Sequence, residues 1–282
     1  MNIDANLDPR HNGTHGGGEG GGKGDGDDED EDGDAVDGPT VEAYVNLAKT
    51  AGKYHLNMCC PIHNLPTSTA CKVYPEDIAA EIGYPELPNL IRQFIYDQQH
   101  SDDASDSSIS DLPMFYGKIT IYPSAVATFH APSDISGIGG MRCECIRAVR
   151  SWRNGPGRYD TIFVNTDSSM AGMRGLDVAR ARLFFSFSYD GIEYPCVLVC
   201  WFSRMGDSPD DQTGMWVVRA DDDETCPPSI IHFDTVVRAA HLFPVFGPER
   251  VSKTLLFTDT LDTFTEFYVN KFVDHHAFEI AS

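Results

Sequence analysis

The sequence lacks a long apolar run. Its longest uninterrupted apolar stretch, Cys196 to Phe202, is far shorter than the roughly 20 residues that a membrane-spanning helix needs. No positively charged segment followed by an apolar run stands after Met1, so we expect no secretory signal. These two absences argue against secretion and against membrane partners. We therefore expect a nuclear or cytoplasmic protein, with the nucleus favoured.

Basic residues are also scarce, with 21 Lys and Arg against 43 Asp and Glu. Residues 1–40 hold 12 acids and 2 bases, whereas residues 112–282 hold 21 acids and 15 bases. The first segment is rich in Gly and Asp, and it cannot bury enough apolar surface to offset its ordering entropy. We expect a disordered acidic head over residues 1–40, which is either a solvated leader or a bait for basic proteins such as histones.

The eight cysteines are expected to be reduced thiols in an intracellular chain. One stretch has spacings that would suit zinc, and it consists of His55, Cys59, Cys60, His63 and Cys71. It lacks a second well-spaced pair, and Pro61 and Pro66 interrupt it. We therefore predict no metal site and no cofactor.

Residues 41–111 are expected to form a helical segment followed by a linker. Apolar spacing predicts helices over Val41–Lys49, Glu76–Ile82 and Pro88–Gln98. Pro75 is well suited to the first turn of the second helix. Residues 100–111 are rich in Ser and Asp, which is typical of a linker.

Residues 112–282 carry the patterns of short strands and tight turns. Asp190-Gly191 predicts a type I′ hairpin turn between strands 176–189 and 192–202, because both turn residues need a positive φ. The other predicted strands are two on either side of Pro123, Arg158–Val164, Met215–Arg219 and Ile230–Phe233, with a further turn and strand within Val236–Phe246. Short strands without long helices between them favour an α+β fold with a small antiparallel sheet curled into a barrel.

The single basic cluster of the sequence lies at a predicted helix, Met141 to Trp152. Ile146, Val149 and Trp152 would share one side of this helix, with arginines on the other. The cluster contains Arg142, Arg147, Arg150, Arg153 and Arg158. Arginines on an exposed face are natural phosphate contacts, so these five are our candidate nucleic-acid-binding residues. The alternative is an ordinary solvated face, or a patch neutralised by the acidic loops of the chain.

A last helix is predicted after Thr258 or Asp259, with Leu261, Phe264, Tyr268 and Phe272 as its apolar stripe. His275 and His276 follow, and adjacent residues cannot share one helical face, so we expect histidines at the edge of the core. Trp201 and Trp216 could line a methyl-lysine pocket. Both lie inside apolar strands, which favours core packing instead.

Several long motifs carry a family resemblance. They include Gly175-Leu-Asp-Val-Ala-Arg-Ala-Arg-Leu-Phe-Phe-Ser-Phe187, Asp210-Asp-Gln-Thr-Gly-Met-Trp216 and Asp274-His-His-Ala-Phe-Glu-Ile280. Over about residues 39–52 and 73–282 the chain resembles the C-terminal region of Plavaka-type transposases of mushroom-forming fungi, relatives of the CACTA group. The resemblance implies that the RNase H-like catalytic region of the family lies upstream of this part. The strand order is also loosely similar to SH3-like or BAH-like modules of chromatin proteins.

Two departures from the family pattern stand out. Cys143 and Cys145 replace residues that are usually charged in the family, which puts a metal role for this pair in doubt. Family chains run almost directly from the equivalent of Ala48-Lys49 to the equivalent of Val73-Tyr74. In this sequence residues 53–72 lie between these two points. Gly52-Lys53-Tyr54 can be encoded by a fungal donor splice sequence, so we hypothesise that residues 53–72 are a retained intron. Sequencing of the spliced transcript tests this, because reads that cross the stretch uncut would disprove it.

The sequence shows no catalytic motif, and we predict a non-catalytic, transposase-derived accessory domain. It would contact DNA or chromatin proteins, or be a non-functional fragment. One alternative is a metal-dependent nuclease or transposase remnant, since clustered carboxylates hold paired Mg²⁺ ions. Its candidates are Asp160 or Asp167, Asp234, and Glu266 or Glu279. The antiparallel hairpin order does not suit an RNase H sheet. The other alternative is a protein–protein assembly module.

Overall fold

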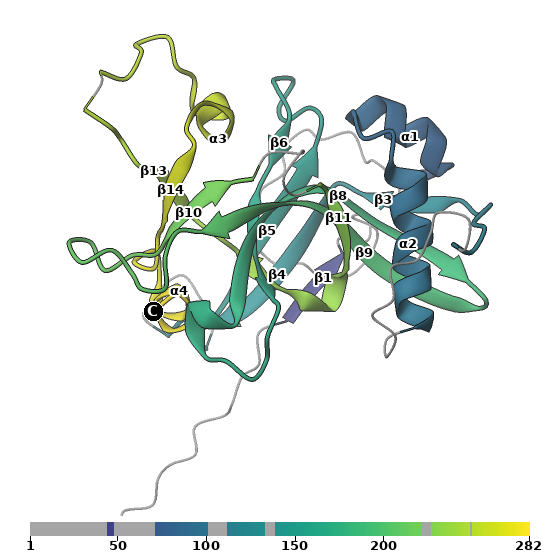
Figure 1. Ribbon diagram of the computed structural model, residues 1–282, viewed down its shortest axis with the longest axis horizontal. Helices are drawn as coiled ribbons and strands as arrows, with labels where there is room; N and C mark the ends of the chain where they lie inside the picture. Colours follow the sequence, from purple (N-terminus) through teal and green to yellow (C-terminus); the bar gives the residue numbers. More distant parts are fainter. Residues whose placement is uncertain (1–43, 48–70, 101–111, 133–138, 222–226, 249) are drawn as a thin grey trace, which may run out of the picture. The chain divides into compact units, whose positions relative to one another are not determined.

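The computed structural model describes residues 44–47, 71–100, 112–132, 139–221, 227–248 and 250–282 (Figure 1). All of them fall within one compact unit, Val41–Ser282. The predicted acidic head, most of the predicted linker and four of the five residues of the zinc-like stretch lie outside the described residues. Cys71 is the fifth, and it is an exposed residue at the start of a strand.

The described elements are mostly short strands. The helices are α1 (Pro75–Ile82), α2 (Leu87–Gln99), α3 (Thr260–Thr263) and α4 (His275–Ile280), with 3₁₀ turns η2 (Gly172–Arg174), η3 (Phe233–Thr235) and η4 (Phe257–Asp259). The strands are β1 (Tyr44–Leu47), β2 (Cys71–Val73), β3 (Ile119–Tyr122), β4 (Ser124–His130), β5 (Met141–Val149), β6 (Arg158–Tyr159), β7 (Thr161–Asn165), β8 (Leu176–Tyr189), β9 (Ile192–Arg204), β10 (Val217–Ala220), β11 (Ser229–His232), β12 (Val236–Ala239), β13 (Leu242–Pro244) and β14 (Glu266–Val269).

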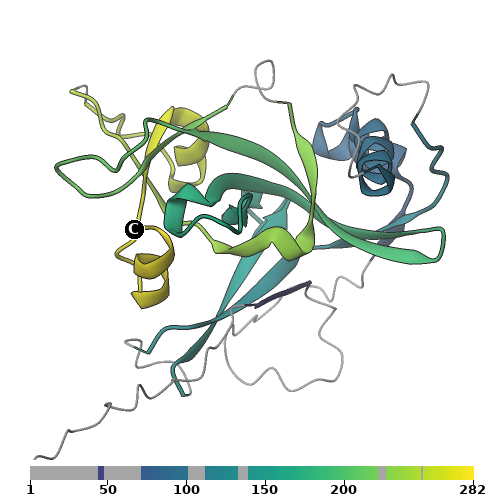
Figure 2. The same cartoon turned by 60° about the horizontal axis from the view of Figure 1, so that its bottom comes forward.

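The long β8–β9 hairpin is the central element, and it forms where the sequence predicts it. Asp190 and Gly191 have φ values of 51° and 79°, as a type I′ turn requires. The two strands pair from Tyr189↔Ile192 down to Val178↔Phe202, and Figure 2 shows them side by side along their length. The register shifts between Ala181 and Leu183, which makes Arg182 the extra residue of a β-bulge.

Two antiparallel sheets are built around this hairpin. The smaller has the order β1-β4-β5-β6, and the larger has the order β12-β7-β8-β9-β10-β14-β13, with β11 beside β9 and β2–β3 beside β8. The α+β class with a curled antiparallel sheet is therefore confirmed. A first apolar cluster contains side chains of β4 and β5 together with side chains of β7, β8 and β9, so it joins the two sheets.

Two further apolar clusters complete the core. In the second, Ile91 and Phe94 of α2 pack with Leu183, Phe185 and Phe187 of the hairpin, so the predicted helices at 76–82 and 88–98 are confirmed. The third includes Val178, Trp216 and Phe267. Burial of each such side chain contributes on the order of 1.5–3 kcal/mol.

The predicted helix from Met141 to Trp152 is wrong, because this stretch forms β5. β5 pairs with β4 from His130↔Met141 to Ser124↔Arg147. Ile146 and Val149 are β-branched and suit a strand, and the ladder with β4 supplies the backbone hydrogen bonds that a helix would have supplied internally. The three-residue spacing of the apolar side chains was therefore not a helical signal.

Two more predicted helices are wrong. Residues 44–47 of the predicted helix Val41–Lys49 form β1, which pairs with β4. The predicted last helix is broken into η4, α3 and β14. In β14 the side chains of Phe267 and Val269 are fully buried and those of Glu266 and Tyr268 are not, so the period of two overrides the helical stripe.

The strands on either side of Pro123 are both present, as β3 and β4. They do not pair with each other: β3 pairs with β2 and β8, whereas β4 pairs with β1 and β5. The chain therefore passes from the larger sheet to the smaller one at Pro123, where the proline cannot donate to a ladder.

Candidate functional site

The β5–β6 connection is a tight turn that carries Trp152 and Arg153. The N–H of Gly155 donates to the carbonyl of Trp152 at 2.9 Å, and the Ser151 hydroxyl donates to the Gly155 carbonyl at 3.0 Å. Arg153 and Asn154 have φ values of 52° and 61°. This left-handed conformation is uncommon for residues other than glycine. Such strain is often concentrated at functional sites.

Three guanidinium groups surround the Trp152 ring. Their central carbons lie 4.2 Å (Arg147), 5.5 Å (Arg153) and 5.7 Å (Arg158) from the ring centroid. Arg147 is only 9% exposed, whereas Arg153 and Arg158 are exposed. The inner arginine is therefore part of the packed structure, and the outer two face solvent.

A second aromatic ring, Tyr159, continues the arrangement. The guanidinium carbons of Arg182 and Arg180 lie 4.4 and 5.9 Å from its centroid, and Arg182 also lies 5.3 Å from the Tyr84 ring. We call this set the arginine–aromatic cluster: Tyr84, Arg147, Trp152, Arg153, Arg158, Tyr159, Arg180 and Arg182. The Nε atoms of Arg180 and Arg182 are buried without a hydrogen-bond partner among the described residues.

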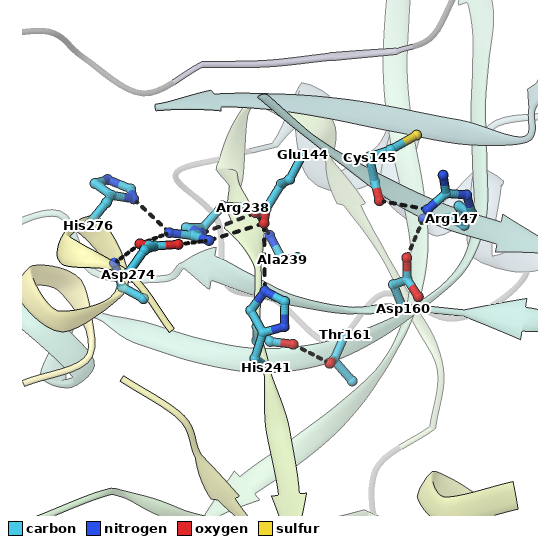
Figure 3. A network of polar contacts seen from close by, with 12 residues as sticks. Glu144, Cys145, Arg147, Asp160, Thr161, Arg238, Ala239, His241, Asp274 and His276 are labelled. Atoms are coloured by element: carbon cyan, nitrogen blue, oxygen red, sulfur yellow. Dashed lines mark hydrogen bonds and ion pairs between the residues drawn. The ribbon is translucent and has the colours of Figure 1, made fainter. Parts of the chain in front are cut away.

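Two aspartates neutralise part of this charge. Asp160 accepts the backbone N–H of Arg147 at 2.9 Å (Figure 3) and the Nε of Arg158 at 2.7 Å. Both terminal nitrogens of Arg180 donate hydrogen bonds to the carboxylate of Asp262, at 2.5 and 3.2 Å. The hydrogen bond from Arg180 lowers the pKa of Asp262, and the charges of Arg180 and Arg182 act in the same direction against the effect of burial. Both aspartates are thus occupied by arginines.

A cleft of about 680 Å³ opens beside the cluster. Its lining includes Trp152, Arg153, Gly155, Pro156, Gly157, Arg158, Tyr159, Asp160, Arg180, Phe257, Thr258 and Leu261. Phe257 is 91% exposed and comes from η4, so the cleft lies between the β5–β6 turn and the η4–α3 segment. Its walls combine aromatic rings with guanidinium groups. A second hollow, of about 440 Å³ at residues 246–264, is mainly apolar.

The structure brings together three of the five predicted arginines. Arg147, Arg153 and Arg158 surround Trp152, and Arg150 lies just before the turn and forms a 2.7 Å ion pair with Glu81 of α1. Arg142 is separated from them, because an odd spacing along β5 places it on the face opposite to Arg147.

Sequence reasoning missed five cluster residues, namely Tyr84, Trp152 as a stacking partner, Tyr159, Arg180 and Arg182. It also missed Phe257 of the cleft. The two β8 arginines had a usable signal, since they alternate with Ala179 and Ala181. These alanines are fully buried in the first apolar cluster, so the arginines project from the opposite face. Tyr84 and Phe257 lie far away in the sequence and gave no local signal.

A separate polar network surrounds Arg238, which is completely buried (Figure 3). Its guanidinium donates to both oxygens of Glu144 at 3.1 Å and to both oxygens of Asp274 at 2.8 and 2.9 Å. It also stacks 3.7 Å from the centroid of Phe129. The network ties β5, β12 and the start of α4, where Asp274 caps the helix by accepting the N–H of Ala277.

The network shifts the titration of its members. Burial would raise the pKa values of Glu144 and Asp274, but other contacts outweigh it and hold both below their usual range. At Glu144 these are the hydrogen bond with His241 and then the charge and hydrogen bonds of Arg238, and at Asp274 they are chiefly the hydrogen bonds from Arg238 and Ala277. Burial and the nearby charge of Arg238 lower the pKa of His276, which stacks on Phe129 at 5.0 Å. His276 therefore packs at the core edge as expected, whereas His275 is exposed, so the prediction for the pair holds for one of the two residues. This network acts as a structural tie.

The remaining candidates are accounted for separately. Trp216 is 3% exposed, and the indole N–H of Trp201 donates to Ser229 at 2.7 Å from a partly buried position, so both pack in the core. Glu266 binds Arg219. In the part of the chain that the structure describes, no three His, Cys, Asp or Glu side chains gather to hold a metal, and no helix is long and apolar enough to span a membrane.

Comparisons of the chain with protein-family models, with curated proteins and with solved structures found no match. The resemblance to Plavaka-type transposases therefore stays a prediction from the sequence motifs. A functional interpretation has to rest on the chemistry of the arginine–aromatic cluster itself.

Proposed function

We propose that this chain is a non-catalytic module that contacts nucleic acid through the arginine–aromatic cluster. The observation that carries the proposal is the set of three guanidinium groups around the Trp152 ring at the mouth of the cleft. Arginine binds phosphate through a planar fork of donors and also stacks on aromatic faces. An accessory role of this kind is also what the transposase resemblance predicts.

The local charge selects the class of ligand. Arg153, Arg158 and Arg180 line the cleft, where Asp160 pairs with Arg158 and Asp262 pairs with Arg180, so three guanidinium groups face two carboxylates. The chain as a whole has a formal net charge of −22, so this local excess of positive charge differs from the rest of the protein. A cationic ligand such as methyl-lysine would be repelled, whereas the phosphates of nucleic acid would be attracted.

The test is a titration of the full chain with a labelled duplex and with its single strand, at about 50 and 200 mM salt. We expect salt-dependent binding that weakens in the double variant Arg153→Ala/Arg158→Ala. Each lost phosphate contact should reduce the slope of log K against log salt by about 0.9 for duplex or about 0.7 for single strand. Arg147 is unsuitable for this test because its side chain is buried.

The matched control is Arg174→Ala/Arg219→Ala, which removes the same charge from surface positions that do not line the cleft. Equal effects of the two double variants would show that binding depends only on the net charge of the protein, which would contradict the proposal. The absence of binding at low salt would contradict it as well. Cleavage of either probe on addition of Mg²⁺ would overturn the non-catalytic assignment.

A further inference from the structure

We propose that the cleft receives one unstacked base of a single-stranded nucleic acid, with the indole of Trp152 as its stacking surface and Arg153 and Arg158 on the adjoining phosphates. This inference rests on the proposed function and specifies its substrate class. It follows from the shape of the site, the exposure of the two outer arginines and a buried donor without an acceptor among the described residues.

The shape of the site favours an unstacked base over the sugar–phosphate backbone of a nucleic acid as its occupant. The cleft encloses about 680 Å³, within the roughly 300–1,000 Å³ of sites that hold small organic groups. Trp152, Tyr159 and Phe257 line it, and Phe257 is 91% exposed without a place in the described apolar clusters. Bases in a duplex are stacked on one another inside the helix, whereas unpaired bases are free to stack on aromatic side chains.

The arginines around Trp152 differ in how firmly they are held. The guanidinium of the buried Arg147 lies 4.2 Å from the ring centroid, at stacking distance. Those of the exposed Arg153 and Arg158 lie 5.5 and 5.7 Å away, on long side chains that face solvent. An incoming base can take the place of the outer pair beside the indole while Arg153 turns to a phosphate and Arg158 exchanges its 2.7 Å ion pair with Asp160 for a second phosphate, and Arg147 holds the ring in position.

Arg180 supplies a polar reason for a base to enter. It lines the cleft, and its Nε is buried without an acceptor among the described residues, although its terminal nitrogens bind Asp262. A buried donor without a partner costs about 1–3 kcal/mol. Every base carries carbonyl or ring-nitrogen acceptors, and one of them can pair with this buried donor when the Arg180 side chain turns it toward the cleft.

The experiment uses tryptophan fluorescence of the full chain during titration with an oligothymidylate. Its comparison ligands are an abasic strand with the same number of phosphates and a duplex of equal length. Trp201 and Trp216 are in or against the core, so base stacking should quench mainly Trp152. We expect quenching by oligothymidylate and little by the abasic strand or the duplex. In Trp152→Phe the quenching should disappear while binding persists.

Affinity gives a second readout. Trp152→Ala should weaken single-strand binding by between about 5-fold and about 150-fold, as expected for loss of one stacked base. Phe257→Ala should weaken it as well, and its high exposure means that folding is unaffected. Tyr116→Ala removes an aromatic ring that is 78% exposed outside the cleft, and it should have no effect.

The outcomes separate this inference from the proposed function. Equal binding of oligothymidylate, abasic strand and duplex, with no effect of Phe257→Ala, would overturn the base pocket and leave phosphate contact standing. Quenching that persists in Trp152→Phe would also overturn it, because another tryptophan would be responsible. Absence of binding to any of the three ligands at low salt would remove both proposals.

Discussion

The guanidinium of Arg147 lies 4.2 Å from the centre of the Trp152 ring, and its backbone N–H donates to Asp160. This arginine therefore connects the end of β5 to the turn that follows it and to the residue after β6. It was predicted as a nucleic-acid contact, yet it is buried at 9% exposure. Its role is to support the residues that face the cleft.

The first prediction separates supporting from contacting arginines. Arg147→Ala should lower the free energy of unfolding by about 1–3 kcal/mol, because it removes a buried stack and leaves space under Trp152. Arg153→Ala should change it by less than about 0.5 kcal/mol, because Arg153 is exposed. Urea unfolding followed by circular dichroism measures both. Equal losses in the two variants would contradict this division.

The second prediction concerns the tie around Arg238. Glu144→Gln should destabilise the protein by about 3–5 kcal/mol, because it removes one charge partner of a buried arginine. Glu279→Gln is the matched control. Glu279 is exposed and pairs with the half-exposed His275 at 3.4 Å, so its loss should cost less than about 1 kcal/mol. Similar unfolding midpoints for the two variants would show that the buried network contributes little.

The third prediction is the response to acid. The pKa values of Glu144 and Asp274 are lower in the folded protein than in the unfolded chain. Their contribution to stability is therefore fully present above about pH 4 and is lost as the pH falls through the lower folded values. Urea midpoints measured from pH 7 to pH 3 should fall steeply below about pH 4. The fall should be shallower in Glu144→Gln, and an unchanged slope would argue against the assignment.

The fourth prediction concerns His276 at milder pH. Its pKa is lowered in the folded state, so the unfolded chain binds a proton first as the pH falls below about 6.5. Stability should therefore decrease from about pH 7 downward, until the pH passes below the folded pKa. His276→Gln should remove this part of the pH dependence without changing the loss at lower pH. Identical profiles for the two proteins between pH 7 and pH 5 would refute it.

The fifth prediction tests the close packing of the β5–β6 turn. A Cβ at Gly157 would lie 2.9 Å from the Tyr159 ring and 3.1 and 3.2 Å from the carbonyls of Val149 and Arg150. Gly157→Ala should therefore cost about 1–3 kcal/mol. Gly247→Ala meets nothing within 4 Å and serves as the control, with little expected change in thermal midpoint. Matching midpoints would mean that the turn relaxes freely.

The sequence was informative where a local signal was decisive. The Asp190-Gly191 turn and the α2 stripe were predictable, because turn chemistry and apolar spacing each favour a single structure there. β5 and β14 were not predictable, because the spacing of their apolar residues fits the period of a helix as well as that of a strand. Only pairing with distant strands decides between the two structures. The arginine cluster was located in the sequence but assigned to the wrong element. Its aromatic partners Trp152 and Tyr159 lie in the same stretch, whereas Tyr84 of the cluster and Phe257 of the cleft lie far away in the sequence, and only the fold brings them near.

The β8–β9 hairpin contributes side chains to all three apolar clusters. Ala179, Ala181 and Phe184 of β8 keep to the first cluster on both sides of the bulge at Arg182, whereas Val178 belongs to the third cluster and Leu183 to the second. No cluster can then melt while the others keep an intact hairpin. The unit should behave as one foldon, in which the slowest-exchanging amides of β8 and β9 report the global opening of the whole unit.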